Sequence, residues 1–130
     1  MGYSQSELED FARRYTDAWN SKIPEKTAAF HAASSSIIVN RGEPSVGIEG
    51  AIEVAEGFYA DVPDLHLVCD GVRGAGAHVI YMWTFTGHHA QTGHPLDVPG
   101  WLEWELDDDM KITSALGWFD GEEYDRQIAG

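Results

Sequence analysis

The chain has 130 residues, a length that suits one domain spanning residues 1–130, and 43% of its residues are hydrophobic, as in packed globular proteins. Its 22 acidic and 8 basic side chains give a net charge of -14 at pH 7, which would repel nucleic-acid phosphates and anionic membrane surfaces. We therefore expect neither nucleic acid nor membrane as a partner.

The cysteine count and the first residues bear on the compartment. Cys69 is the only cysteine, so no intrachain disulfide can form. The start Met1–Gln5 lacks the basic and apolar segments of a secretory signal, and no run reaches the roughly 20 apolar residues of a membrane span. We expect a cytoplasmic location.

Helical signals dominate the N-terminal part of the chain. Ser4 or Ser6 can cap a first helix, whose apolar side chains recur at helical spacing: Leu8, Phe11, Ala12, Tyr15, Ala18 and Trp19. Pro24 begins a second, shorter helix that runs to His31 and is broken at 34–36.

A short strand and a third helix follow. The β-branched run 37–39 predicts the strand, and Gly42 and Pro44 mark a loop at 40–44. The third helix is predicted from Gly47 to Pro63, with an apolar stripe of Ile52, Ala55, Phe58 and Tyr59.

From residue 65 onward the hydrophobic pattern has the two-residue period of strands. Strands are predicted at 65–73, 78–87, 98–106 and 111–120, and a bend or bulge is expected near Pro99 and Gly100. We expect the second of these strands to turn its bulky side to the core, namely Val79, Tyr81, Trp83 and Phe85. Its other side then faces outward and carries Ile80, Met82, Thr84 and Thr86. The residues after 121 are read as a short polar tail with a helical turn.

The register of the last two strands follows from their hydrophobic pattern. Pairing Leu106 with Ile112 turns Glu103 and Glu105 to solvent, whereas the alternative register turns both glutamates to the core. With this pairing and strict alternation, one apolar face carries Leu102, Trp104, Leu106, Ile112, Leu116, Trp118 and Asp120. The sequence thus predicts that Asp120 ends a cavity face, where loss of hydration would suit it to proton transfer.

Three helices and a short strand followed by four long strands indicate an α+β fold with helices on one face of a curved sheet. Several motifs resemble the SnoaL-like polyketide cyclases of the NTF2-like, or ketosteroid isomerase-like, superfamily. These are Gly47–Ile52 leading to Val62–Asp64, Trp83–His88, Thr92–Pro95, and Trp118–Asp120 before Arg126 and Gln127. The resemblance covers about Leu8 to Gln127 and implies a cone: a curved antiparallel or mixed sheet wrapped around three N-terminal helices, with an internal pocket.

The resemblance also implies roles for single residues. The general acid/base aspartate that ends the last strand of these cyclases matches Asp120, and the aromatic residues of the first helix that line the cone match Tyr15 and Trp19. The histidine that assists this acid in the antibiotic cyclases has no match here. The sequence carries no phosphate loop or redox motif, and we expect no cofactor.

The residue patterns leave two interpretations open for each polar candidate. Asp120 either serves the cavity or caps the turn at 121–123, because Asp is a favoured N-cap. Asn40 either binds a ligand carbonyl, as a second catalytic residue, or satisfies loop backbone. His31 is read as a partly buried or helix-end histidine rather than a catalyst.

One loop carries the residue types of a metal site, namely His88, His89, His94 and Asp97. Their spacing is irregular and the loop is rich in glycine. A solvated loop is the better interpretation, and we expect no metal.

Three tryptophans on adjacent predicted strands, Trp83, Trp104 and Trp118, exceed what a close-packed core of this size needs. They indicate a pocket for a small hydrophobic or aromatic molecule. The residues expected to line it are Tyr15, Trp19, Phe58, Tyr81, Trp83, Leu102, Trp104 and Trp118. The outward side with Met82, Thr84 and Thr86 predicts a homodimer formed through the sheet.

Two classes of function fit these observations. The first is a cofactor-independent enzyme of cyclase or isomerase type, in which Asp120 moves a proton on a hydrophobic carbonyl compound. Asn40, Tyr15 or an indole N–H then stabilises the oxyanion. The second is a non-catalytic module of the same fold that binds a hydrophobic ligand or dimerises. A buried Asp120 favours the enzyme, and an Asp120 bonded only to backbone N–H groups favours the module.

Overall fold

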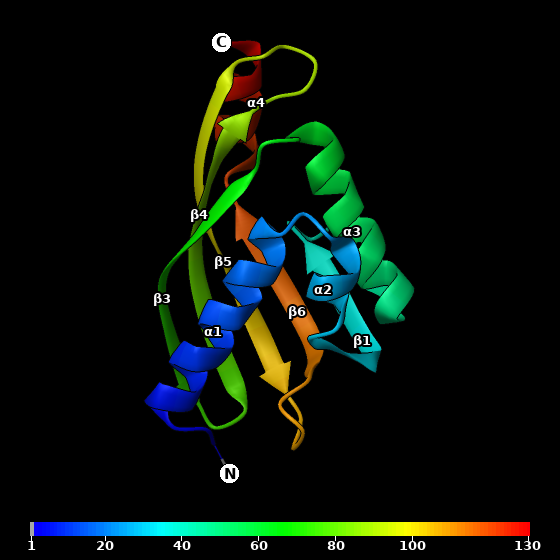
Figure 1. The fold of residues 1–130 in the computed structure, drawn as a ribbon, viewed down its shortest axis with the longest axis vertical. Coiled ribbons are helices and arrows are strands. Elements are labelled where there is room, and N and C mark those ends of the chain that lie inside the picture. Colours follow the sequence, from blue (N-terminus) through cyan, green and yellow to red (C-terminus); the bar gives the residue numbers. More distant parts are fainter. Residues whose placement is uncertain (1) are drawn as a thin grey trace.

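The computed structural model describes residues 2–130, which form an α+β fold with one six-stranded sheet. Three helices, α1, α2 and α3, lie on one side of the curved sheet, and α4 lies near one end of it (Figure 1). The elements in chain order are α1 (Gln5–Asn20), α2 (Pro24–Ala28), β1 (His31–Val39), β2 (Ser45–Val46), α3 (Gly47–Asp61), β3 (His66–Ala75), β4 (His78–His88), β5 (Pro95–Leu106), β6 (Ile112–Phe119) and α4 (Gly121–Ala129).

The sheet has the strand order β2-β1-β6-β5-β4-β3. The pair of β1 and β6 is parallel, and the other pairs are antiparallel. The long chain segment between β1 and β6 contains α3 and the three strands β3 to β5, so the first and last long strands meet in the sheet interior. This arrangement confirms the predicted fold class of mixed sheet and N-terminal helices.

The first helix begins and packs as its sequence predicts. Ser4 is the N-cap, and its Oγ accepts a hydrogen bond from Glu7 N while Glu7 Oε1 accepts one from Ser4 N, which is a capping box. The buried side of α1 is the predicted apolar stripe of Leu8, Phe11, Ala12, Tyr15 and Ala18. Within residues 2–130, no helix is long and apolar enough to cross a bilayer.

The predicted second helix is too long. It ends at Ala28, and β1 already begins at His31, so 34–36 lies inside a strand rather than breaking a helix. The reason is tertiary: β1 pairs with β6 at His31 and again, after a register shift, from Ser36 to Val39. Burial of Ser35 and Ile37 on the sheet accompanies this pairing, which outweighs the weak strand preference of the three serines.

The predicted pairing of Leu106 with Ile112 is confirmed, but the strict alternation beyond it is wrong. Leu106 pairs with Ile112 and Glu105 pairs with Ser114, so Thr113 is an extra residue, a β-bulge. Its hydroxyl donates a hydrogen bond to the Glu105 carbonyl oxygen. Beyond the bulge the faces of β6 are exchanged, so that the inner face carries Ala115, Gly117 and Phe119 and the outer face carries Ser114, Leu116 and Trp118.

The predicted break of the strand by a bulge at Pro99 and Gly100 is also wrong, because β5 runs unbroken from residue 95 to 106 and pairs with β4 along its whole length without a register shift. The pairing of β5 with β6 begins only at Gly100, opposite Phe119. Pro99 therefore lies in the part of β5 that extends beyond β6. A proline, which has no backbone N–H, is tolerated there because no β6 residue is paired with it.

The sheet's inner face and the helices enclose an aromatic core. Trp104 and Tyr81 are fully buried and stack with ring centroids 5.0 Å apart. Tyr15 of α1 packs edge-on against both, at 4.8 Å from Trp104 and 5.2 Å from Tyr81. Edge-to-face and offset arrangements of this kind are the favourable ones for aromatic rings.

Gly100 has no side chain, which allows the Trp83 ring to lie against the β5 backbone. A methyl group added at Gly100 should therefore destabilise the fold. A Cβ at Gly100 would be 2.4 Å from the Trp118 carbonyl oxygen and 2.5 Å from the Trp83 ring. We expect Gly100→Ala to lower the free energy of unfolding by about 2 kcal/mol, because the core must shift to admit it. Denaturant unfolding with circular dichroism measures this.

Gly57→Ala is the matched control. Gly57 lies in α3, is exposed, and an added Cβ there would have no neighbour within 4 Å. The substitution should stabilise the protein by roughly 0.5–1 kcal/mol through helix propensity. Equal effects of the two substitutions would contradict the packing described for Gly100.

Candidate functional site

The helices and the inner face of the sheet enclose a cavity of about 70 Å³. Its wall combines residues of α1, α2 and α3 with residues of all strands except β2, and with Leu65. The lining residues are Tyr15, Trp19, Thr27, His31, Ile37, Val39, Ala51, Val54, Phe58, Leu65, Leu67, Trp83, Phe85, Leu102, Ala115, Gly117 and Phe119.

The cavity's size limits its occupant. An engineered apolar cavity of about 150 Å³ holds one benzene molecule, and pockets for drug-sized ligands span roughly 300–1,000 Å³. At about 70 Å³ this cavity has roughly half the volume of the one that holds benzene, so even a single small ring requires lining side chains to move.

Aromatic rings form much of the wall. Phe58, Phe85, Trp83 and Phe119 contact one another in a closed cycle, with successive ring centroids 6.4, 5.9, 6.3 and 6.3 Å apart. Trp19 extends this cycle from α1, 6.0 Å from Phe58. The wall therefore presents a continuous apolar and polarisable surface to a ligand.

No carboxylate, lysine or arginine is among the residues that line the cavity. The polar groups of the wall are the hydroxyls of Tyr15 and Thr27, the Trp19 and Trp83 indoles and the imidazole of His31. The Thr27 hydroxyl already donates a hydrogen bond to the Pro24 carbonyl oxygen, at 2.8 Å. The site is thus almost wholly apolar and uncharged.

His31 is the buried titratable group of β1. The side chain is 6% exposed, and its Nδ1 shares a hydrogen bond of 2.9 Å with Oγ of Ser35, which is itself 1% exposed. Burial lowers the pKa of His31 to about 4, because an imidazolium here would lose hydration without meeting a carboxylate. At neutral pH the ring is therefore uncharged.

Tyr15 contributes a protonated hydroxyl. Burial raises the pKa of Tyr15 far above its usual value, and the neighbouring Trp19 indole opposes this shift only in part. Tyr59 supports the same end of α1 by donating a hydrogen bond of 2.7 Å to the Trp19 carbonyl oxygen.

The structure brings together five of the predicted pocket residues, namely Tyr15, Trp19, Phe58, Trp83 and Leu102. Tyr81 and Trp104 lie behind them, fully buried in the core rather than in the cavity wall. Trp118 lies on the opposite face of the sheet, where it stacks on Trp101 with ring centroids 6.5 Å apart. Its predicted place in the pocket was wrong because the Thr113 bulge exchanges the faces of β6.

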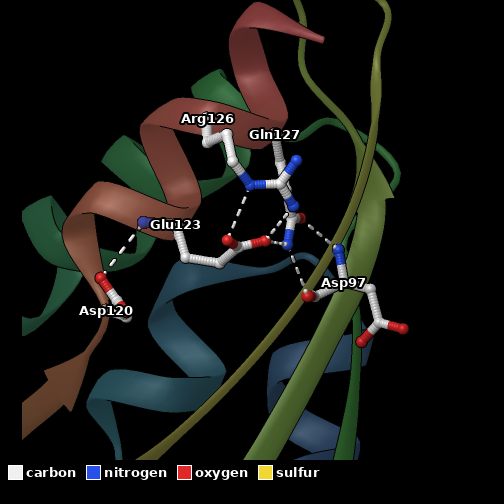
Figure 2. A network of polar contacts seen from close by, with 5 residues as sticks. All are labelled: Asp97, Asp120, Glu123, Arg126 and Gln127. Carbon is white, nitrogen blue, oxygen red and sulfur yellow. Dashed lines mark hydrogen bonds and ion pairs between the residues drawn. The ribbon is translucent and has the colours of Figure 1, made fainter.

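The prediction that Asp120 lies in the cavity is wrong. Asp120 is exposed and is the N-cap of α4, and its Oδ1 accepts a hydrogen bond of 3.1 Å from Glu123 N (Figure 2). The chain leaves β6 at Phe119, whose side chain takes the cavity position, and Asp120 begins the helix that the sequence predicted only as a turn. Of the two interpretations left open for Asp120, the structure favours the cap.

The helix that Asp120 caps is attached to β5 by a two-point contact. Gln127 Oε1 accepts from Asp97 N at 2.8 Å, and Gln127 Nε2 donates to the Asp97 carbonyl oxygen at 3.0 Å (Figure 2). Arg126 donates to Glu123 and holds the pKa of that carboxyl down at about 2, with Gln127 contributing less. This network fixes α4 at the end of the sheet.

Asn40 lies in the exposed turn after β1 rather than in the cavity. Its backbone is left-handed, with φ of 50°, and its Oδ1 accepts a hydrogen bond of 2.9 Å from Phe119 N. The side chain thus satisfies backbone at the end of β6. An Asn at such a turn is a common structural choice.

The histidine-rich loop does not gather a metal site in the part of the chain that the structure describes. His88 Nδ1 lies 2.7 Å from Asp64 Oδ2, and His94 Nδ1 lies 2.6 Å from the Ile128 carbonyl oxygen. These two histidines join the loop to neighbouring elements.

Sequence reasoning missed several cavity residues. Leu67 alternates with exposed neighbours along its predicted strand, and this signal could have identified it as inward-facing. Phe85 was predicted to face the core but not to line the pocket. Ala115, Gly117 and Phe119 were assigned to the wrong face by the unseen bulge. His31 was placed in a helix, so its position beside Ser35 on the inner face of β1 could not be read.

Comparisons with known proteins agree with the architecture. A family model of the SnoaL-like domain matches residues 12–115. No curated protein sequence matches the chain.

Solved structures at low identity share the fold. A provisionally assigned SnoaL-like polyketide cyclase from Jannaschia sp. CCS1 is 18% identical with a TM-score of 0.86, covering 100% of this chain and 98% of that one. A protein of ketosteroid isomerase-like fold from Catenulispora acidiphila DSM 44928, in complex with trimethylamine, is 19% identical with a TM-score of 0.85, covering 92% of each chain. TerC, co-crystallised with polyporic acid, is 13% identical with a TM-score of 0.80, covering 95% of this chain and 98% of that one. These likenesses confirm the predicted NTF2-like fold.

The capping role of Asp120 predicts how two substitutions differ. Asp120→Ala should lower the free energy of unfolding by about 1 kcal/mol, because Glu123 N loses its acceptor. Asp120→Asn should change it by less than about 0.5 kcal/mol, because the amide oxygen still accepts. Denaturant unfolding of both variants measures the difference. An Asp120→Asn variant that folds normally yet loses ligand binding would contradict a purely structural role.

Proposed function

The chain belongs to the SnoaL-like domain family, and we propose that it binds a small, uncharged, mainly apolar molecule in its internal cavity. The observation that carries this proposal is the composition of the cavity wall, which is aromatic and aliphatic and has no charged side chain. An apolar ligand gains there by leaving water. An ion would lose its hydration and find no counter-charge.

Two related structures support a ligand site in this fold. One relative is in complex with trimethylamine, and TerC was co-crystallised with polyporic acid. These ligands differ greatly in size and charge. They therefore support a ligand-binding cavity in this fold, but they do not indicate which ligand this chain binds.

Proton transfer by a cavity carboxylate is the function that the geometry favours less. Asp120 is exposed and accepts a hydrogen bond from the backbone N–H of Glu123, and the cavity lining contains no Asp or Glu. The neutral wall favours binding over a cyclase or isomerase reaction of the carboxylate type.

Filling the cavity tests the binding function. Ala115 is 2% exposed and lines the cavity, so the larger side chain in Ala115→Leu should occupy ligand space. We expect the affinity for small apolar probes such as benzene or cyclopentane derivatives to fall at least about tenfold, since the added volume competes with the ligand. Calorimetry or ligand-observed NMR measures the affinity.

Ala129→Leu is the matched control, because Ala129 is exposed in α4. The substitution adds the same atoms as Ala115→Leu, but away from the cavity. It should bind the probes like the wild-type protein. If the wild-type protein binds no small apolar probe, the proposed function fails.

We also propose that two copies associate through the outer face of the sheet. Met82, Trp101 and Trp118 are cross-strand neighbours there, and Met82 and Trp101 are 39% and 43% exposed. The Arg41 guanidinium lies 5.6 Å from the Trp118 ring and extends the patch. An exposed row of large apolar side chains on a regular sheet favours a self-complementary contact.

The dimer is tested by placing a charged side chain at the middle of the apolar outer face. Trp101→Glu should give a monomer, whereas Ile48→Glu, at a residue of α3 that is 38% exposed, should leave the dimer intact. Because each copy carries -14, added salt should tighten association by screening repulsion. Sedimentation at micromolar concentration measures both effects. A monomeric wild-type protein under these conditions would end the proposal.

A further inference from the structure

We propose that the cavity recognises the acceptor oxygen of a small carbonyl compound, and that the Nε2–H of His31, held in this tautomer by Ser35, is the group that binds it. This inference rests on the proposed binding function and names the class of ligand. It concerns a residue that the sequence patterns placed outside the site.

The first step is the position of the ring. His31 is 6% exposed and belongs to the cavity wall, at the strand β1 that the parallel partner β6 holds in place. Only one ring nitrogen, Nδ1, has a hydrogen-bond partner within residues 2–130. The fully buried polar side-chain atoms without a partner in this part of the chain are Trp104 Nε1, Trp118 Nε1 and Tyr124 Oη. His31 Nε2 is not among them and therefore keeps accessible surface, on a residue that lines the cavity.

The second step is the tautomer. Ser35 is 1% exposed, and within the described residues its hydroxyl has His31 Nδ1 as its only partner. If Nδ1–H donated to Ser35, the serine proton would be buried without an acceptor, at a cost comparable to a lost hydrogen bond. The better arrangement has the Ser35 hydroxyl donating to Nδ1, which places the ring proton on Nε2.

The third step is the chemistry of the ligand. An uncharged imidazole with Nε2–H accessible from the cavity offers a donor in a largely apolar wall, whose other polar groups are the Tyr15 and Thr27 hydroxyls and the Trp19 and Trp83 indoles. A purely apolar ligand would cover this donor and leave it unpaired, whereas a ketone or aldehyde oxygen accepts its hydrogen bond. A carboxylate ligand would also accept, but the cavity lining offers it no lysine or arginine.

A matched pair of ligands isolates this one hydrogen bond. Cyclopentanone and methylenecyclopentane have the same shape and differ in C=O against C=CH2. The readout is the ratio of their dissociation constants, alkene over ketone, in each variant. We expect His31→Phe to lower this ratio about tenfold, because the hydrogen bond to the ketone is lost while the apolar contacts remain.

His31→Gln should retain part of the ratio, since its amide still donates. His66→Phe is the control of the same residue type, because His66 is exposed at the start of β3. It should leave the ratio within about twofold of the wild-type value.

A second measurement reads the tautomer in the wild-type protein itself. Ring nitrogen NMR of the wild-type protein reports the tautomer of each histidine, and comparison with the His31→Gln spectrum assigns His31. We expect the Nε2–H form, and we expect its Nε2 signal to shift when the ketone binds but not when the alkene binds.

The outcomes separate this inference from the function on which it rests. If the wild-type protein binds both ligands and a folded His31→Phe variant keeps the full ratio, His31 is not the recognition group. A wild-type His31 protonated at Nδ1 would also overturn the inference. If neither ligand binds the wild-type protein, the proposed function itself fails and this inference fails with it.

Discussion

One extra residue in β6 decides which side chains meet the cavity. Because the bulge at Thr113 exchanges the faces of the strand, the small residues Ala115 and Gly117 face inward beside Leu102, while Trp118 faces outward onto Trp101. Two residues of little volume at the inner face leave open space there. The same exchange puts two indoles together on the outer face, so the bulge shapes both the candidate ligand site and the candidate dimer surface.

The end of β6 shows how position on a strand separates structural from binding roles. Phe119 contributes a ring to the cavity wall, and the next residue, Asp120, is already outside it as the cap of α4. Gln127 then attaches α4 to the Asp97 backbone on β5. The polar residues of this segment thus hold a helix at the end of the sheet, and the cavity itself is left without a carboxylate.

Because the cavity is uncharged, its few polar groups determine which ligands it favours. Burial depresses the pKa of His31 to about 4 and raises the pKa of Tyr15, so both groups are neutral at ordinary pH. A neutral donor in an apolar wall contributes more to selectivity than to affinity, because a wrong ligand leaves it unpaired.

The sequence alone determined the α+β class, the first and third helices, the two-residue period of the long strands and the pairing of Leu106 with Ile112. These follow from local signals: a capping box, helical spacing in α1, and alternation along β4 that separates Tyr81 and Trp83 from Met82. Only the tertiary structure decided the rest. A bulge leaves no mark in the hydrophobic pattern, because a strand read in isolation keeps its period and the extra residue exists only relative to its partner. From the sequence alone, His31 is likewise predicted at the end of a helix. Its place in a strand depends on pairing with β6, a long-range contact that no short stretch of sequence contains. The hydrogen bond between His31 and Ser35 on the inner face depends on that placement.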